Sequence, residues 1–578
     1  MKRTHNNGEL RIKNTDDVVE LIGWVAKRRN LGSLVFIDLR DRYGITQLVF
    51  AVQLAEKIKD VRNEYILAVS GVVRARQSVN ANLPTGEIEV AVFEVDIVNS
   101  AETTPLIIAD VTDALEEVRL KYRYLDLRRP LMQKNIIDRH RIVKCIRAYL
   151  DAQDFIEVET PILTISTPEG ARDYLVPARV HPGQFYALPQ SPQLFKQLLM
   201  VAGLERYYQV ARCFRDEDLR ADRQLDFTQI DIETSFLEAT DIHQMIEEMM
   251  VKVMKEVRDI EVSMPFTRLT FEEALNKYGS DKPDNRFELC LQDVSDIFID
   301  SEFKVFSEGL KVGKVIKALC VADFGEVSRK QVDDYGELIK KHGGSGLVSL
   351  KFKDNTLEGS AAKYVTAAEK ERLCEALNPK DNAMIFIVCD FWEKACNALG
   401  ALRSALGKEL KLYDPQVYSF LWVEDFPLFE YDENDQRYYS RHHPFTRPQT
   451  ADVEEVKANP AAIIAQAYDL VLNGNEVAGG SLRIYNQEMQ KAVFEILGFT
   501  AEQIQARFGF FVDAFKYGTP PHGGIAIGLD RLVMVILQTD SIRDVIAFPK
   551  NAAARCPLTD APSAVDAKQL EELHIKIV

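Results

Sequence analysis

The sequence has no run of 18 apolar residues, so no membrane-spanning helix is expected. Its eight cysteines are scattered, and none forms a C-x-x-C pair or a cluster with histidine. This spacing predicts neither a zinc site nor a disulfide framework, and it favours a reduced, cytoplasmic protein. The first ten residues are basic but no apolar stretch follows them, so a secretory signal is not expected.

Basic residues are also fewer than acidic residues. The net charge of −17, taken alone, argues against binding to nucleic acid. Between residues 22 and 78, however, there are ten Lys and Arg residues against five Asp and Glu, and such a local basic face can bind phosphates. A chain of 578 residues, 46% of them hydrophobic, predicts several globular domains rather than one core.

The N-terminal region has the pattern of a small β-barrel. Strands are expected at residues 18–29, 34–40, 45–51, 65–76 and 87–98, with a short helical piece at 53–60. Five strands with a helix between the third and fourth predict an OB-type barrel. Val35, Ile37 and Leu39 are expected inside the barrel, and Phe36 lies on the other face of that strand. Phe36 then either stacks on an unpaired base or caps the barrel core.

Residues 99–135 are predicted to be a linker, with a dense basic stretch at 119–129. This stretch either follows a nucleic-acid backbone or forms a salt-bridged hinge. An amphipathic helix is expected at 135–151, followed by a strand at 155–159 and by Pro161 at its edge.

A second predicted domain, residues 282–412, interrupts the C-terminal half. Strands are expected at 304–306, 347–352 and 384–389, together with helices, so the segment is interpreted as an inserted α+β domain. Its glycine-rich stretch 343–346 lacks the Lys-Ser/Thr of a phosphate-binding P-loop and is interpreted as a turn.

The stretch from Arg206 to Phe236 predicts an antiparallel hairpin with a long charged loop. On its returning strand, a period of two places Phe227, Gln229, Asp231 and Glu233 on one face. An aromatic ring, an amide and two carboxylates do not form a core face. The strand is therefore either the floor of a pocket for a polar ligand or an exposed strand with a solvated face.

These residues resemble a known family. FRDED followed by FTQIDIE resembles motif 2 of the class II aminoacyl-tRNA synthetases. The helix, strand and proline at 135–161 resemble motif 1, and HGGIAIGLDRLVMVIL at 522–537 resembles motif 3. Almost the whole chain resembles the bacterial type of aspartyl-tRNA synthetase. Leu225-Asp226 departs from the Pro-Glu that relatives commonly carry there.

The resemblance implies a multidomain α+β fold with an OB-fold barrel, an antiparallel-sheet catalytic domain and an inserted domain of the GAD type. The expected order is an anticodon-binding domain (1–105), a hinge (106–135), the first catalytic segment (136–281), the insert (282–412), the second catalytic segment (413–555) and a C-terminal extension (556–578). Motif 1 implies a homodimer.

The resemblance also implies a two-step reaction. The carboxylate of L-aspartate attacks the α-phosphate of ATP, and the aspartyl group then passes to the 3′ end of tRNA(Asp). The first step needs no general base because the carboxylate is already ionised, so it depends on positioning and charge neutralisation. Two carboxylates on facing strands, at positions 469 and 476, suit Mg²⁺ on the ATP phosphates.

Residue roles carry over from the same resemblance. The expected catalytic residues are Arg215, Glu217 and Arg531. The expected amino-acid-binding residues are Glu169, Ser191, Gln193, Lys196, Arg215, Gln229, Asp231, His442 and Arg483. The expected ATP-binding residues are Arg215, Asp216, Glu217, Gln224, Phe227, Glu476, Gly528, Leu529, Asp530 and Arg531. The expected metal ligands are Asp469 and Glu476, and the expected anticodon contacts are Arg29, Leu31, Phe36 and Gln47.

Lys196 and the bidentate fork of Arg483 suit a side-chain carboxylate, which favours aspartate over asparagine. Two interpretations of the tRNA specificity stay open: an enzyme restricted to tRNA(Asp), or a non-discriminating form that also charges tRNA(Asn). A non-catalytic, synthetase-like RNA-binding protein is a remote alternative. The buried charged residues that the motifs retain argue against it.

Overall fold

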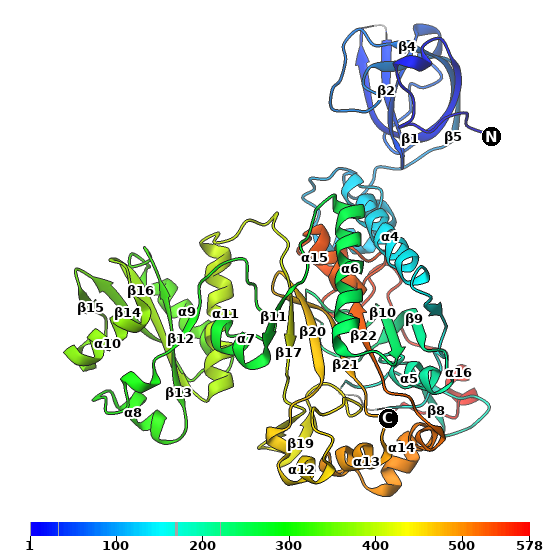
Figure 1. Cartoon of the computed structure of the whole chain (residues 1–578). Helices are drawn as coiled ribbons and strands as arrows, with labels where there is room; N and C mark the ends of the chain where they lie inside the picture. Colours follow the sequence, from blue (N-terminus) through cyan, green and yellow to red (C-terminus); the bar gives the residue numbers. More distant parts are fainter. Residues whose placement is uncertain (1, 33, 168–170, 220, 578) are drawn as a thin grey trace. The chain divides into compact units, whose positions relative to one another are not determined.

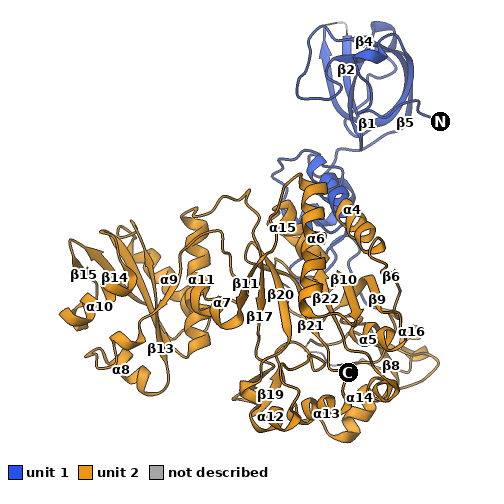
Figure 2. Cartoon of the chain, viewed as in Figure 1, with its two compact units in different colours: residues 1–139, 543–564 blue, residues 140–542, 565–578 orange. Residues whose placement is uncertain are grey.

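The computed structural model describes residues 2–32, 34–167, 171–219 and 221–577. The chain divides into two compact units (Figure 2). Unit 1 contains residues 1–139 and 543–564, and unit 2 contains residues 140–542 and 565–578. Among the residues described, no helix has the length and apolar character that crossing a membrane requires.

Unit 1 begins with a closed β-barrel whose strands follow the order β1-β2-β3-β5-β4 (Figure 1). Its elements are β1 (Val18–Leu31), β2 (Leu34–Asp41), β3 (Gly44–Phe50), α1 (Val52–Ala55), β4 (Ile66–Ala75) and β5 (Ile88–Asn99). Val35, Ile37 and Leu39 alternate into the barrel core. The predicted five-stranded OB-type barrel, with a short helix after its third strand, is confirmed.

Short helices occupy much of the segment that was expected to be a linker. They are α2 (Glu116–Lys121), α3 (Arg123–Asp126) and the start of α4 (Pro130–Asp151), which begins at residue 130 rather than 135. The fully buried Asp126 accepts ion pairs from Arg119 at 3.0 Å, Arg123 at 2.6 Å and Arg129 at 2.7 Å. These guanidinium groups are engaged within the protein, which favours the salt-bridged hinge over contact with a nucleic-acid backbone.

Unit 2 is built on an eight-stranded sheet in the order β11-β17-β20-β21-β22-β10-β9-β6. The strands are β6 (Ile156–Glu157), β9 (Arg206–Phe214), β10 (Asp226–Ser235), β11 (Thr267–Thr270), β17 (Phe420–Glu424), β20 (Ala467–Leu472), β21 (Asn475–Leu482) and β22 (His522–Gly528). Its two end pairs, β11–β17 and β6–β9, are parallel, and the pairs between them are antiparallel. This agrees with the predicted antiparallel-sheet catalytic domain.

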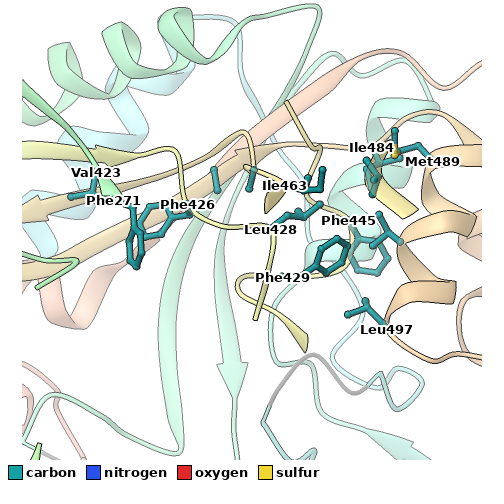
Figure 3. Packing of buried hydrophobic residues seen from close by; sticks show 14 of the residues in the cluster. Phe271, Val423, Phe426, Leu428, Phe429, Phe445, Ile463, Ile484, Met489 and Leu497 are labelled. Atoms are coloured by element: carbon teal, nitrogen blue, oxygen red, sulfur yellow. The ribbon is translucent and has the colours of Figure 1, made fainter. Parts of the chain in front are cut away.

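Helices and two small hairpins surround this sheet. The helices are α5 (Gln193–Val201), α6 (Ala239–Arg258), α7 (Phe271–Tyr278), α12 (Val453–Ala458), α13 (Gln487–Ile496), α14 (Ala501–Ala514), α15 (Leu529–Leu537) and α16 (Ala567–Glu572). The hairpins are β7 (Leu175–Pro177) with β8 (Phe185–Ala187), and β18 (Phe429–Asp432) with β19 (Arg437–Ser440). Figure 3 shows some of one core, in which Phe271, Phe426 and Phe445 are buried.

Between α7 and β17 the chain forms a separate five-stranded sheet in the order β12-β13-β16-β14-β15. Its elements are β12 (Leu291–Asp293), α8 (Lys304–Lys311), β13 (Val315–Val321), α9 (Arg329–Lys341), β14 (Val348–Lys353), β15 (Thr356–Glu358), α10 (Ala367–Leu377), β16 (Ala383–Asp390) and α11 (Trp392–Glu409). The predicted strand at 304–306 is wrong, because these residues begin α8. Phe306 and Gly309 are buried on one side of that helix, at helical rather than strand spacing.

Candidate active site

A cavity of about 720 Å³ lies in unit 2 over strands β10, β21 and β22. Most of the residues that the sequence predicts for substrate binding meet here, although they come from distant regions of the chain. Those that line the cavity are Ser191, Gln193, Lys196, Arg215, Glu217, Gln224, Phe227, Gln229, Asp231, His442, Asp469, Glu476, Arg483, Gly528, Asp530 and Arg531.

The closed end of the cavity holds a buried network of two cations and two anions. Lys196 Nζ lies 3.0 Å from Asp231 Oδ1 and 3.3 Å from Glu233 Oε2, and Arg483 Nε lies 2.9 Å from Glu233 Oε1. The four side chains are each about 1% exposed or less. Charges buried this deeply require such pairing, since each would otherwise lose its hydration without compensation.

The two carboxylates of this network differ in their pKa values. Burial raises the pKa of Asp231 above its ordinary value even though Lys196 opposes the shift. Burial also acts to raise the pKa of Glu233, but Arg483 and Lys196 together outweigh it and hold that pKa below its ordinary value. Asp231 Oδ2 is buried and has no hydrogen-bond partner among the described residues, so this oxygen is available to a cationic group of a ligand.

Arg483 makes different contacts from those expected. Its Nε and one terminal nitrogen donate to the two oxygens of Glu233 at 2.9 and 3.1 Å, so the bidentate fork is engaged within the protein. The other terminal nitrogen donates to Ser481 Oγ at 2.6 Å and to His443 Nε2 at 2.7 Å. Burial lowers the pKa of His443 well below its ordinary value, and the positive charge of Arg483 lowers it further. The ring therefore stays neutral and can accept a hydrogen bond.

The period of two predicts Glu233 on the pocket-floor face of β10, beside Gln229 and Asp231, but names no contact for it. The site predictions from the sequence do not include His443 or Ser481. His443 and Ser481 become recognisable only when the fold brings β21 and the segment after β19 together.

The outer wall of the cavity carries an arginine beside an aromatic ring. The guanidinium carbon of Arg215 lies 5.2 Å from the centre of the Phe227 ring, within the range of a cation–π contact. Glu217 lies 4.0 Å from Arg215 and 2.6 Å from Arg223. Arg215 Nε is buried and has no hydrogen-bond partner in the part of the chain that the structure describes, and this donor indicates an acceptor supplied by a ligand.

Arg531, at the start of α15, faces the same space. It donates to the backbone oxygen of Glu476 at 2.8 Å and to Asp222 at 3.2 Å. Its Nε is buried, and no described residue accepts a hydrogen bond from it. Asp530, next to it, accepts the backbone N–H of Thr228 at 2.8 Å and thereby ties α15 to β10.

Two carboxylates face each other across the β20–β21 hairpin. A Cβ atom placed on Gly479 would lie 2.8 Å from Asp469 Oδ1 and 3.8 Å from Glu476 Oε1, so the glycine keeps this space open. Burial and the neighbouring Asp469 raise the pKa of Glu476. Two hard oxygen donors that repel each other fit a Mg²⁺ ion, which commonly takes one or two carboxylates and completes its shell with phosphates. Among the described residues no group of three or more His, Cys, Asp or Glu side chains forms a metal cluster.

Among the described residues, two of those expected at the site, Asp216 and Leu529, do not line the cavity. Glu169 lies outside the described residues. Asp216 is exposed, and its backbone N–H donates to Arg172 O at 3.0 Å. Leu529 is 1% exposed and packs in the core under α15, because the helix turns this side chain away from the cavity.

The residues expected to read an anticodon lie on the barrel of unit 1. Arg29 pairs with Phe36 across β1 and β2, and Asp38 pairs with Gln47 across β2 and β3, so these side chains share one face. Arg29 lies 2.6 Å from Asp38 and 3.2 Å from Gln47. Phe36 is partly exposed on this outer face, and Leu31 is 72% exposed.

Comparisons with known proteins place this chain in a family. Residues 115–552 match the family model described as tRNA synthetases class II (D, K and N), and residues 19–98 match an OB-fold nucleic acid binding domain. The chain belongs to the class II tRNA synthetases of the D, K and N group. ATP is accordingly a substrate of this synthetase.

Bacterial relatives of this synthetase match it from end to end. The aspartate–tRNA(Asp/Asn) ligase of Geobacillus sp. is 54% identical over 582 residues, which cover 100% of this chain and 98% of that protein. The aspartate–tRNA ligase of Halalkalibacterium halodurans is 53% identical over 586 residues, with the same shares covered.

Solved structures share the fold of this synthetase. Asparaginyl-tRNA synthetase from Pyrococcus horikoshii aligns with a TM-score of 0.60 at 19% identity and covers 95% of this chain and 98% of its own. Aspartyl-tRNA synthetase from Entamoeba histolytica aligns with a TM-score of 0.57 at 18% identity, covering 95% and 91%.

Proposed function

We propose that this synthetase is an aspartate–tRNA ligase, which activates L-aspartate with ATP and transfers the aspartyl group to tRNA(Asp). The observation that carries the proposal is the buried network of Lys196, Asp231, Glu233 and Arg483 at the closed end of the cavity. It offers cationic groups to a side-chain carboxylate, and to an ammonium group it offers a carboxylate oxygen that pairs with no described residue.

Lys196 and the fifth N–H of the Arg483 guanidinium, which the contacts to Glu233, Ser481 and His443 leave over, take the aspartate side chain. Glu233 holds the rest of the Arg483 guanidinium in a fixed orientation through two hydrogen bonds. Asparagine would place a neutral amide against these cations and leave them without their anionic partner. In a buried site that mismatch costs several kcal/mol, on the order of a thousandfold or more in selection.

The ammonium end of aspartate lies against Asp231, with Ser191, Gln193 and Gln229 around it. Asp231 Oδ2 supplies the negative charge, because its other oxygen already accepts from Lys196 at 3.0 Å. We assign His442, which lies 3.6 Å from Asp469, to the opposite side of the substrate. Glu169 completes this group in the proposal, as the family resemblance implies.

ATP occupies the outer region of the cavity. Arg215 neutralises the α-phosphate and the attacking carboxylate, which lowers the barrier to their approach. Phe227 and Arg531 stack on the two faces of the adenine ring, while Glu217 and Gln224 bind its polar groups or the ribose. Gly528 keeps the wall open there. Asp530 positions this wall through its hydrogen bond to β10. Asp216 and Leu529 do not line the cavity, so they support the ATP site without contacting ATP.

Asp469 and Glu476 would hold Mg²⁺, as their facing oxygens and the open space at Gly479 fit. When bound, the ion offsets the charge of the ATP phosphates. Burial and then the charge of Asp469 raise the pKa of Glu476, and a cation placed between the two carboxylates would relieve their repulsion.

The barrel face of Arg29, Phe36 and Gln47 is the proposed anticodon site, with the exposed Leu31 at its rim. Phe36 would stack on a base, since its ring is partly exposed next to hydrogen-bonding groups. A second possibility, in which the enzyme also charges tRNA(Asn), is favoured by the names of relatives such as the Geobacillus aspartate–tRNA(Asp/Asn) ligase. We further propose a cytoplasmic homodimer. Sedimentation as a monomer at about micromolar concentration would contradict the dimer.

Charging of purified tRNAs tests this function. The protein is incubated with ATP, Mg²⁺ and labelled aspartate or asparagine, using tRNA(Asp) and tRNA(Asn) in separate reactions. Aspartate on tRNA(Asp) alone is the expected result for a discriminating enzyme, and aspartate on both tRNAs for the non-discriminating form. Asparagine transfer, or no transfer by the folded protein, would overturn the proposal.

A further inference from the structure

One segment reaches the cavity through a single residue, Asp281, and has no role in the proposed reaction. It is the connector, residues 279–289, which leads from α7 into the inserted sheet at β12. Asp281 of the connector lines the same cavity as Arg531 and Glu476. The next residue, Lys282, is exposed, and its ammonium group makes no hydrogen bond or ion pair with the described residues.

The inserted domain binds the connector through one buried arginine. Arg403 on α11 is 1% exposed and donates to three backbone oxygens, those of Asp284 at 2.9 Å, Phe287 at 2.8 Å and Leu289 at 2.5 Å. Its guanidinium carbon also lies 3.9 Å from the centre of the Phe287 ring. A guanidinium group that donates hydrogen bonds to three backbone carbonyl oxygens fixes the path of that backbone.

The start of the connector is held by close backbone contact with the same helix. A Cβ atom on Gly400 of α11 would lie 1.8 Å from Gly279 O, so only glycine permits this approach. Gly279 itself has φ +68°, a conformation that favours glycine. Helix α11 therefore determines where the connector leaves α7.

On its other side the connector touches the hairpin that carries the two facing carboxylates. A Cβ atom on Gly474, in the β20–β21 turn, would lie 3.1 Å from Asp284 Cβ. Asp281 adds its negative charge to those of Asp469 and Glu476, so this end of the cavity needs cations before it can accept a polyanion. The connector itself carries one such cation, because Lys282 directly follows Asp281 and is exposed.

We propose that the connector forms a wall of the ATP site, in which Lys282 contacts the outermost phosphates, and that the inserted domain positions this wall through Arg403. The inference rests on the proposed function, since it names a further binding residue for the same reaction. It also gives the insert a role: Arg403 is a positioning residue, because it acts through the connector and touches no substrate.

The first test compares the wild type with Lys282→Gln in aspartate-dependent exchange of pyrophosphate into ATP. Loss of one charge-assisted phosphate contact is expected to raise the KM for ATP about tenfold. The KM for aspartate stays unchanged. Lys311→Gln, at an exposed lysine on α8, is the matched control and leaves both constants at the wild-type value. An unchanged KM for ATP in Lys282→Gln would overturn the inference.

The second test asks whether the insert acts through Lys282. Arg403→Met is expected to raise the KM for ATP by a similar factor, and to add little to it in the Lys282→Gln background. Additive effects would overturn the positioning role. If the melting temperature shows that Arg403→Met is unfolded, Arg403→Lys, which keeps the positive charge but has no planar fork, replaces it. Absence of exchange in the wild type would instead contradict the proposed function, so the two failures are distinguishable.

Discussion

Replacing Lys196 by methionine removes one charge from the buried network and nearly preserves the volume of the side chain. Lys196 Nζ lies 3.0 Å from Asp231 and 3.3 Å from Glu233, and it has no exposed surface. Without it, two buried carboxylates share the single guanidinium of Arg483. Removal of one partner from a buried ion pair costs about 3–5 kcal/mol of folding free energy.

The same substitution removes a charged contact to the aspartate side chain. A hydrogen bond to a charged group contributes about 1.5–3 kcal/mol, which corresponds to a loss of roughly ten- to 150-fold in kcat/KM for aspartate. The KM for ATP should stay near the wild-type value, since ATP binds in the outer region of the cavity.

The assay is aspartate-dependent pyrophosphate exchange, with a melting curve recorded for each variant. Lys255→Met, at a half-exposed lysine on α6, is the control and should change stability by less than about 0.5 kcal/mol, with activity intact. An unchanged kcat/KM for aspartate in folded Lys196→Met would refute the assignment of Lys196 to the substrate carboxylate.

Three further predictions address other regions of the molecule. His243 stacks on Trp422 with ring centres 4.2 Å apart, and burial lowers its pKa from 6.5 to about 3, so its contribution to stability is lost as the pH falls below 6.5. As the pH falls from 6.5 to about 5, the wild type should therefore lose about 2 kcal/mol more of its unfolding free energy than His243→Phe does. Equal losses of unfolding free energy in the two proteins, measured by calorimetry, would contradict this. Gly479→Ala places a methyl group 2.8 Å from Asp469 Oδ1 and should raise the Mg²⁺ concentration for half-maximal exchange several-fold, whereas an unaltered titration would exclude a metal between the carboxylates. Arg29→Gln should weaken tRNA(Asp) binding about fivefold or more, with pyrophosphate exchange unchanged, and parallel losses in both assays would contradict a role confined to the anticodon.

Strongly periodic segments made much of the fold predictable. The barrel strands alternate Val35, Ile37 and Leu39 inward, and that period of two survives in the folded barrel because one face of each strand must leave water. Short segments were less predictable. Residues 304–306 contain an apolar pair that suits either state, and only packing of Phe306 and Gly309 against the inserted sheet decides for helix.

The residues that meet at the cavity were recognisable from motifs, but their mutual contacts were not. The contact of the Arg483 fork with Glu233 could not be predicted, because the fold brings together two residues that are 250 positions apart in the chain. The role of the connector could not be predicted for a similar reason. Nothing in the local sequence indicates that Asp281 lines the cavity or that Arg403 holds the backbone leading from it.

The most direct test of the central claim, that the cavity selects and activates aspartate, is exchange of labelled pyrophosphate into ATP in the absence of tRNA, with aspartate or asparagine as the amino acid. Exchange that requires aspartate, with asparagine at least about a thousandfold less effective in kcat/KM, is the predicted result. Equal exchange with both amino acids, or exchange with asparagine alone, would contradict it.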